Sequence, residues 1–155
     1  METSASPQEK SARIINDNLY LTLATSSASG EPWATPLLYA LHSGGICFMS
    51  DARSLHVRNI LENAGVAFAV FDSHSRLGEN DEVQASGRAS VVEEPGELEQ
   101  CIAAYSNRVF PGSSLPPSKR YDQSDFVGEG SKRFVLIKPD RVYVRWEGEL
   151  VQVRL

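Results

Sequence analysis

Short strand patterns separated by tight turns run along most of this chain, and they constrain its fold more than any other feature. Leu19, Leu21 and Leu23 alternate with Tyr20, Thr22 and Ala24, which predicts a half-buried strand. A turn rich in Ser, Gly and Pro, SSASGEP, comes next. Roughly eight strands joined mostly by hairpins predict a mainly β fold, a closed antiparallel barrel with helices packed outside.

The remaining elements follow from the same kind of pattern. The run 66–71 is nearly all apolar, which predicts a strand buried on both faces. Gly87, inside the long strand 83–92, predicts a bulge or a point of close approach. Helices are expected to begin near Ser6, Ser54 and Pro95, and Ser6 with Glu9 forms a capping box. The other expected strands are 33–41, which should form a meander with 19–24 and 46–49, and the closing strands 134–137, 141–146 and 150–153.

Length and composition indicate one soluble domain. We expect residues 1–8 to form a disordered N-terminus and residues 9–155 a single domain. The net charge of −5, without a basic stripe, argues against nucleic acid as a partner. No apolar run approaches the roughly 20 residues of a membrane helix, and no signal peptide is visible, so we expect a cytoplasmic protein without a membrane partner.

The cysteines and histidines form no recognisable metal motif, so no metal site is expected. Cys47 lies in an apolar strand pattern and Cys101 on an apolar helical face. Both are expected to be buried free thiols, and a disulfide between them is the less favoured alternative.

The segment 44–65 carries the most distinctive chemistry. A short strand there runs into a loop and a helix that opens with Arg53, Ser54, His56 and Arg58. A helix N-terminus presents free N–H groups and a partial positive charge, and these side chains add a hydroxyl, an imidazole and two guanidiniums. Such a group in an acidic protein favours a phosphorylated ligand, whereas the arginines alone are also typical of a solvated helix.

Four segments, taken in order, resemble the FMN-binding split barrel of the pyridoxamine 5′-phosphate oxidase-like family. They are LTLATSSASGEPWATPLLYAL, GICFMSDARSLHVRNILENAGVAFAV, VQASGRASVV and RFVLIKPDRVYVRW, and the resemblance covers about Arg13 to Trp146. It implies a split β-barrel of antiparallel strands with about three helices outside. It also implies an oxidoreductase-like protein that binds FMN in a groove between the two subunits of a homodimer.

The resemblance further implies which residues contact the flavin. Its ring and ribityl chain are expected beside the backbone of Thr35, Pro36 and Leu37 and beside Met49 and Ser50. Its phosphate is expected at Ser54 and His56, with Arg53, Arg58 and Asn59 as further candidates. Gln84 is expected to reach in from the partner subunit, and Trp146 to cover the ring or the substrate side.

Two departures from the family pattern bear on function. The chain ends in WEGELVQVRL and lacks the basic stretch with an Arg-Leu-x-Pro tail that binds the substrate phosphate in the true oxidase. Oxidation of pyridoxamine phosphate is therefore not expected, and neither the substrate nor a catalytic residue is assigned. The usual phosphate lysine is replaced by His56, so Arg53 or Arg58 would carry more of the positive charge.

Two other classes of function stay open. One is a flavin- or haem-binding module without turnover, in which His42, His56 or His74 would be the axial ligand of a haem. The other is a reductase that uses the deazaflavin F420, whose acidic tail would be met by basic residues of the long loop 111–132 and its end, namely Lys119, Arg120, Lys132 and Arg133.

Overall fold

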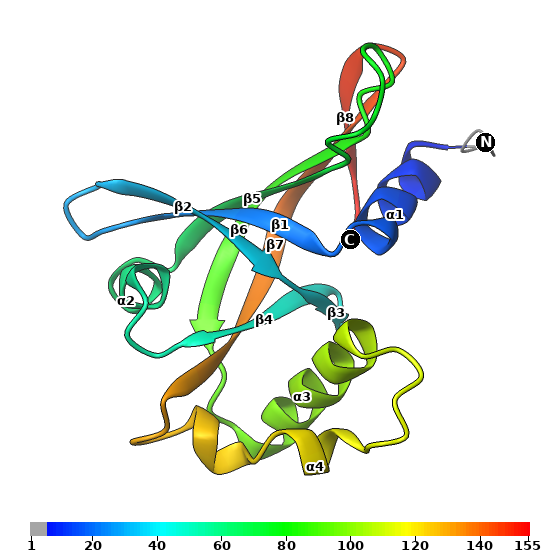
Figure 1. Cartoon of the computed structure of the whole chain (residues 1–155). Helices are drawn as coiled ribbons and strands as arrows, with labels where there is room; N and C mark the ends of the chain where they lie inside the picture. The colour runs from blue at the N-terminus through cyan, green and yellow to red at the C-terminus, as the bar shows by residue number, and fades with distance from the viewer. Residues whose placement is uncertain (1–5) are drawn as a thin grey trace.

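The computed structural model describes residues 6–155 as a curled antiparallel sheet with helices around it (Figure 1). The strand order is β2-β1-β5-β6-β7-β4-β3, with β8 paired to β7. The strands are β1 Tyr20–Ser26, β2 Pro32–Leu38, β3 Ala40–His42, β4 Gly45–Asp51, β5 Gly65–Phe71, β6 Glu82–Val91, β7 Lys132–Trp146 and β8 Glu149–Val153. The helices are α1 Pro7–Asp17, α2 Leu55–Glu62, α3 Pro95–Val109, α4 Pro117–Arg120 and the 3₁₀ turn Gln123–Phe126.

The mainly β architecture predicted from the strand patterns is confirmed. The helix starts are confirmed as well, and Ser6 caps α1 by accepting a hydrogen bond from the N–H of Glu9 at 3.2 Å. Residues 7 and 8, expected in the disordered N-terminus, are helical. The part of that expectation that concerns residues 1–5 lies outside the described residues.

The predicted strand 33–41 is divided in two. Its first part, β2, pairs with β1, while its second part, β3, pairs with β4. Strand β4 pairs on its other side with β7 rather than with β2. The chain therefore leaves one hairpin for another near Tyr39, and the predicted three-strand meander becomes two separate hairpins.

Strand β7 corrects the prediction that residues 134–137 and 141–146 form two separate strands. It runs without interruption from Lys132 to Trp146, and its register against β6 shifts between Ser86 and Gly87. Gly87 lies opposite Pro139, where a Cβ atom would collide with the carbonyl oxygen of Lys138. The bulge that Gly87 predicted is confirmed, and it accommodates the proline within the ladder.

Strand β5 also differs from its prediction, because only one of its faces is buried. Val66, Phe68 and Val70 point into the core, whereas Ala67 and Ala69 lie on the open outer face of the sheet. None of the described elements covers that outer face over β1, β5 and β6. Because alanine is apolar, Ala67 and Ala69 resemble core residues in the sequence. The strand nevertheless alternates between buried and open positions, as a half-buried strand does.

Two hydrophobic clusters fill the two sides of the strand pair β4–β7. One lies inside the barrel and includes Leu23, Phe48 and Val144. The other lies under α3 and includes Cys47, Cys101 and Phe134. Both cysteines are buried free thiols, as predicted. Because successive strand residues face opposite clusters, β4 is held firmly from both sides up to the start of the loop before α2.

Candidate phosphate and cofactor site

The loop between β4 and α2 is built by a tight turn around Asp51. The Asp51 side chain accepts a hydrogen bond from the N–H of Arg53 at 2.7 Å, and its carbonyl accepts one from the N–H of Ser54 at 3.1 Å. Ser54 is the N-cap residue of α2, but its hydroxyl makes no capping hydrogen bond. The first N–H groups of a helix have no intrahelical acceptor, so this helix start keeps its capacity to bind an anion.

The Ser54 hydroxyl is engaged by His56 instead. The Nε2 atom of His56 lies 2.7 Å from the Oγ of Ser50 and 3.3 Å from the Oγ of Ser54. These three side chains, which we call the serine–histidine cluster, come from the end of β4 and the start of α2. His56 is 7% exposed, and burial lowers its pKa below the ordinary value, so that the ring is neutral at pH 7.

The two arginines lie on the open side of the helix start. Arg53 is almost fully exposed and forms an ion pair with Asp51 at 3.5 Å. Arg58 is exposed as well, and no carboxylate of the described residues pairs with it. Both guanidiniums therefore lie at the solvent side of the predicted phosphate position, where an anion would attract them without displacing a buried partner.

Asn59 has a different position from the other phosphate candidates. It is 4% exposed, and its amide donates a hydrogen bond to the hydroxyl of buried Thr25 at 3.1 Å. One turn later, Asn63 donates to the hydroxyl of Ser26 at 2.8 Å. These two hydrogen bonds hold α2 against β1, so Asn59 positions the helix. Sequence patterns missed Thr25 and Ser26, because these partners lie on β1, far from α2 in the sequence.

The candidates on β2 and β4 face different ways, because the side chains of a strand alternate. Thr35 lies opposite Leu23 on the inner side of the sheet, and its buried hydroxyl has no hydrogen-bond partner among the described residues. Leu37 is 9% exposed and belongs to the core, whereas Pro36 is exposed. On β4, Ser50 joins the serine–histidine cluster, whereas Met49 packs with the apolar cluster under α3.

Gln84 and Trp146 lie away from the serine–histidine cluster. Gln84 is exposed on the outer face, where it lies between Ala69 and Tyr143 of the neighbouring strands. Trp146 ends β7, while Ser50 pairs with Arg133 near the beginning of that strand. Figure 1 shows α2 and the β7–β8 hairpin on opposite sides of the molecule. One protomer therefore does not bring these two residues to the start of α2.

The outer face of the sheet contains two adjoining cavities of about 500 and 520 Å³. Small side chains floor the first of them, and Gln84, Tyr143 and Arg141 border it. Arg141 donates a hydrogen bond to the hydroxyl of Ser86 at 3.1 Å. Sequence reasoning missed this surface, although residues 22, 24, 67, 69, 84 and 86 alternate in their strands with buried residues.

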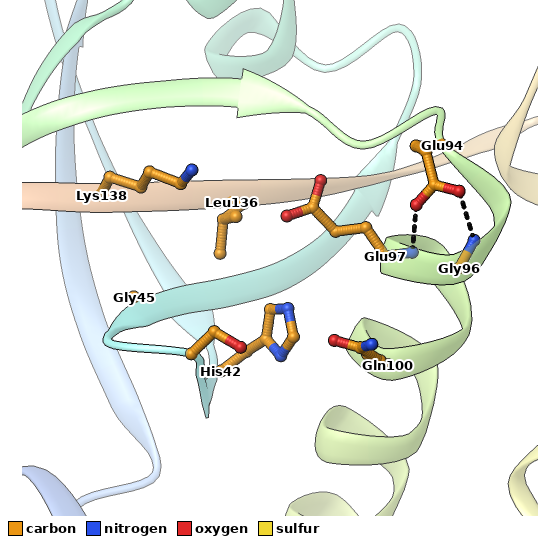
Figure 2. Close-up of a pocket in the computed structure, with 9 residues that line it drawn as sticks. His42, Gly45, Glu94, Gly96, Glu97, Gln100, Leu136 and Lys138 are labelled. Carbon is orange, nitrogen blue, oxygen red and sulfur yellow. Dashed lines mark hydrogen bonds between the residues drawn. The ribbon is translucent and has the colours of Figure 1, made fainter.

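A third cavity, of about 400 Å³, lies between α3 and the β3–β4 turn (Figure 2). Its walls include His42, Gln100, Glu97 and Lys138. Glu94 caps α3 by accepting hydrogen bonds from the N–H groups of Gly96 and Glu97, so the start of this helix carries a negative charge and does not resemble that of α2.

Comparison with known proteins places the chain in a family. The family model for pyridoxamine 5′-phosphate oxidase matches residues 7–146. The chain belongs to this family. No curated protein sequence matches it. No helix within residues 6–155 combines the length and the apolar composition needed to cross a membrane.

Solved structures confirm the split-barrel fold of this member. A conserved hypothetical protein from Mycobacterium tuberculosis is 24% identical, with a TM-score of 0.70 and coverage of 92% of this chain and 86% of that one. The haem storage protein HutZ from Vibrio cholerae is 19% identical, with a TM-score of 0.70 and coverage of 89% and 94%. A structure titled F420 reductase is 20% identical, with a TM-score of 0.56 and coverage of 81% and 89%.

The residues named for the haem and F420 alternatives are scattered. His74 is exposed beside Asp72, His42 lines the cavity next to α3, and His56 is bound by two serines. Among the basic residues of the long loop, Arg133 donates hydrogen bonds to the carbonyls of Gly128, Gly130 and Lys132. Its guanidinium therefore braces the loop and is not free for a ligand.

Proposed function

We propose that this protein binds FMN, with the phosphate at the start of α2, and acts as an FMN-dependent oxidoreductase on a small molecule. The observation that carries the proposal is the start of α2, where uncapped N–H groups, the hydroxyls of Ser50 and Ser54 and the ring of His56 meet. Arg53 and Arg58 supply positive charge at its solvent side. A phosphate monoester satisfies such donors, whereas a neutral ligand leaves them unpaired.

The proposal places the rest of the cofactor beside β2, where one polar group lacks a partner among the described residues. The buried hydroxyl of Thr35 has no partner among the described residues, and a buried polar group of this kind costs free energy unless a ligand completes it. Flavin heteroatoms at the edge of the ring would accept or donate the missing hydrogen bond. A bound flavin supplies the redox chemistry, and the residues of this chain bind and orient it and keep water from it.

A second copy of the chain is part of the proposal. Thr35 and Gln84 project from opposite faces of one sheet, so they contact the same ligand only if they belong to different protomers. The outer face around Gln84 is made of small side chains with polar groups at its border, and other described elements leave it open. A homodimer that covers this face would bring Gln84 and Trp146 of one protomer toward the cofactor of the other.

The test begins with the protein as purified. We expect a yellow protein whose chromophore is released on denaturation and identified as FMN by mass spectrometry. If the protein is purified empty, FMN should bind at least ten times more tightly than riboflavin, which lacks the phosphate. A colourless protein that neither flavin saturates would refute the proposal. Release of haem or of F420 instead would support one of the two alternatives.

The dimer is tested separately by light scattering. Ala67→Arg places a charge on the outer face and should give a monomer that has lost FMN affinity. Ala12→Arg, at an exposed position of α1, is the matched control and should remain a dimer. A wild-type monomer that still binds FMN would contradict the shared site while leaving flavin binding intact.

A further inference from the structure

A buried histidine lies at the start of α2, beside the proposed phosphate position. His56 is the second residue of α2, and its Nε2 atom faces the hydroxyls of Ser50 at 2.7 Å and of Ser54 at 3.3 Å. Its ring also packs beside Phe48, with 6.0 Å between the ring centroids. The ring is therefore fixed at the proposed phosphate position and shielded from bulk water.

Within residues 6–155, no carboxylate forms an ion pair with this ring. Asp51 on the preceding loop is exposed and turned toward Arg53. Thr25 of β1 and Thr35 of β2 contribute only hydroxyl groups. Glu62 lies at the far end of α2, where it accepts a hydrogen bond from the N–H of Ala28.

The basic side chains of the neighbouring elements also have little influence on the charge state of His56. Arg58 is exposed on α2, and Arg88 of β6 is exposed and lines a cavity of the outer face. On β7, the guanidinium of Arg133 is bound to carbonyl groups, and the Lys132 ammonium lies 6.0 Å from the Tyr121 ring centroid. Burial is then the dominant influence on His56, and it lowers the pKa of the ring.

We propose that phosphate binding at the start of α2 is coupled to the uptake of one proton by His56, so that the cofactor is held more tightly as the pH falls toward 6 and is released more readily above neutrality. This inference rests on the proposed function. The proton comes from solvent, and no bond other than N–H is made or broken. A dianionic phosphate supplies the negative charge that the apo site lacks, and it stabilises the imidazolium at the position where burial alone disfavours it.

The geometry of the serine–histidine cluster explains how one added proton changes both the charge of the site and the hydrogen-bond donors that it offers. A neutral ring whose Nε2 carries no proton accepts a hydrogen bond from the Ser50 hydroxyl, which then points away from a ligand. A protonated ring donates from Nε2 to the same serine oxygens. The hydroxyl hydrogens of Ser50 and Ser54 are then free to point at the phosphate, so protonation adds one charge and releases hydrogen-bond donors together.

The experiment measures proton uptake when FMN binds. Calorimetric titrations at pH 7.5 in two buffers of different ionisation enthalpy give the number of protons taken up. The wild type should take up a substantial fraction of one proton with FMN and none with riboflavin. His56→Lys, which keeps a cation there at every pH used, should bind FMN with no uptake, and His56→Asn should bind it weakly with none.

Two controls isolate the contribution of His56. The phosphate titrates with a pKa of about 6, and His56→Lys reports that contribution alone. The FMN affinity of the wild type relative to this variant should fall by up to about tenfold per pH unit above neutrality, which is the limit for one linked proton. His74→Asn removes an exposed histidine and should behave as the wild type does.

Three outcomes separate the hypotheses. Proton uptake that is the same in the wild type, His56→Lys and His56→Asn would overturn the coupling, although FMN still binds. Uptake that is lost only in the His56 variants would support it. Failure of both flavins to bind any variant at any pH would refute the proposed function instead. If His56→Asn does not fold, the comparison of the wild type with His56→Lys decides the matter.

Discussion

The hydrogen bond between Asn59 and Thr25 gives the sharpest test of how this site is built. Both residues are 4% exposed, and the amide nitrogen lies 3.1 Å from the hydroxyl oxygen. Thr25→Val keeps the side-chain shape but removes the acceptor, which leaves a buried amide donor unpaired. Such a group costs about 1–3 kcal/mol of the free energy of unfolding. Asn59→Leu leaves the Thr25 hydroxyl unpaired and should cost about as much.

The double variant separates the bond from the sum of its parts. With both partners apolar no polar group is left unpaired, so the loss should be about 1 kcal/mol rather than the sum of two penalties. The coupling free energy should then be at least about 1 kcal/mol, as for residues in direct contact. Urea unfolding of the apo protein measures it, provided that the m value stays unchanged.

The same three variants decide whether Asn59 is a ligand or a positioning residue. If it positions α2, Thr25→Val and Asn59→Leu should weaken FMN binding by similar factors, and the double variant should be no weaker than either. If Asn59 contacts the phosphate itself, only the variants that lack Asn59 should lose affinity. Additive stability losses, with full FMN affinity in Thr25→Val, would refute our reading of this contact.

Three further predictions follow from particular residues. Ser54→Ala with Arg58→Ala should weaken FMN binding by about 1.5–3 kcal/mol for each lost charge-assisted bond, with little change in the apo melting temperature; equal affinity in titrations would contradict the phosphate site. Gly87→Ala should lower stability by about 1–3 kcal/mol in urea unfolding, because its Cβ meets backbone, whereas Gly65→Ala should change it little. Apo stability should fall as the pH drops below 6.5, where unfolded His56 gains a proton that the folded ring resists, and His56→Asn should flatten this slope.

The sequence predicted the elements of this fold better than their connections. Alternation placed β1 correctly from Leu21 onward, because Leu21 and Leu23 are buried and their neighbours are not, whereas Leu19 is exposed and precedes the strand. It failed at β7, where Pro139 is typical of a turn but lies opposite a glycine bulge. A proline within a strand ladder is tolerated where the pairing with the partner strand is irregular. Here that irregularity depends on Gly87 of β6, which lies far from Pro139 in the sequence.

The predictions for the site differ in the same way: residues brought together by one segment were predicted, but a contact between distant segments was not. The clustering of Ser54, His56 and Ser50 follows from one strand–loop–helix segment, and the sequence placed all three there. Asn59 belongs to the same segment, yet its partner Thr25 lies on β1. A helical residue at that spacing faces either a ligand or the sheet, and only the packing of α2 decides which.

Strand alternation, which specifies the fold, also determines how many chains the proposed site requires. Thr35 on β2 and Gln84 on β6 belong to one sheet but to opposite faces, so no rotation of a side chain brings them together. The outer face explains why β5 was misread, since Ala67 and Ala69 are apolar but are covered by no described element. An apolar strand face that no described element covers is consistent with the proposed homodimer, in which a second copy would cover it. The misreading of β5 and the proposal of a second copy therefore rest on the same observation, the apolar side chains of Ala67 and Ala69 on an open face.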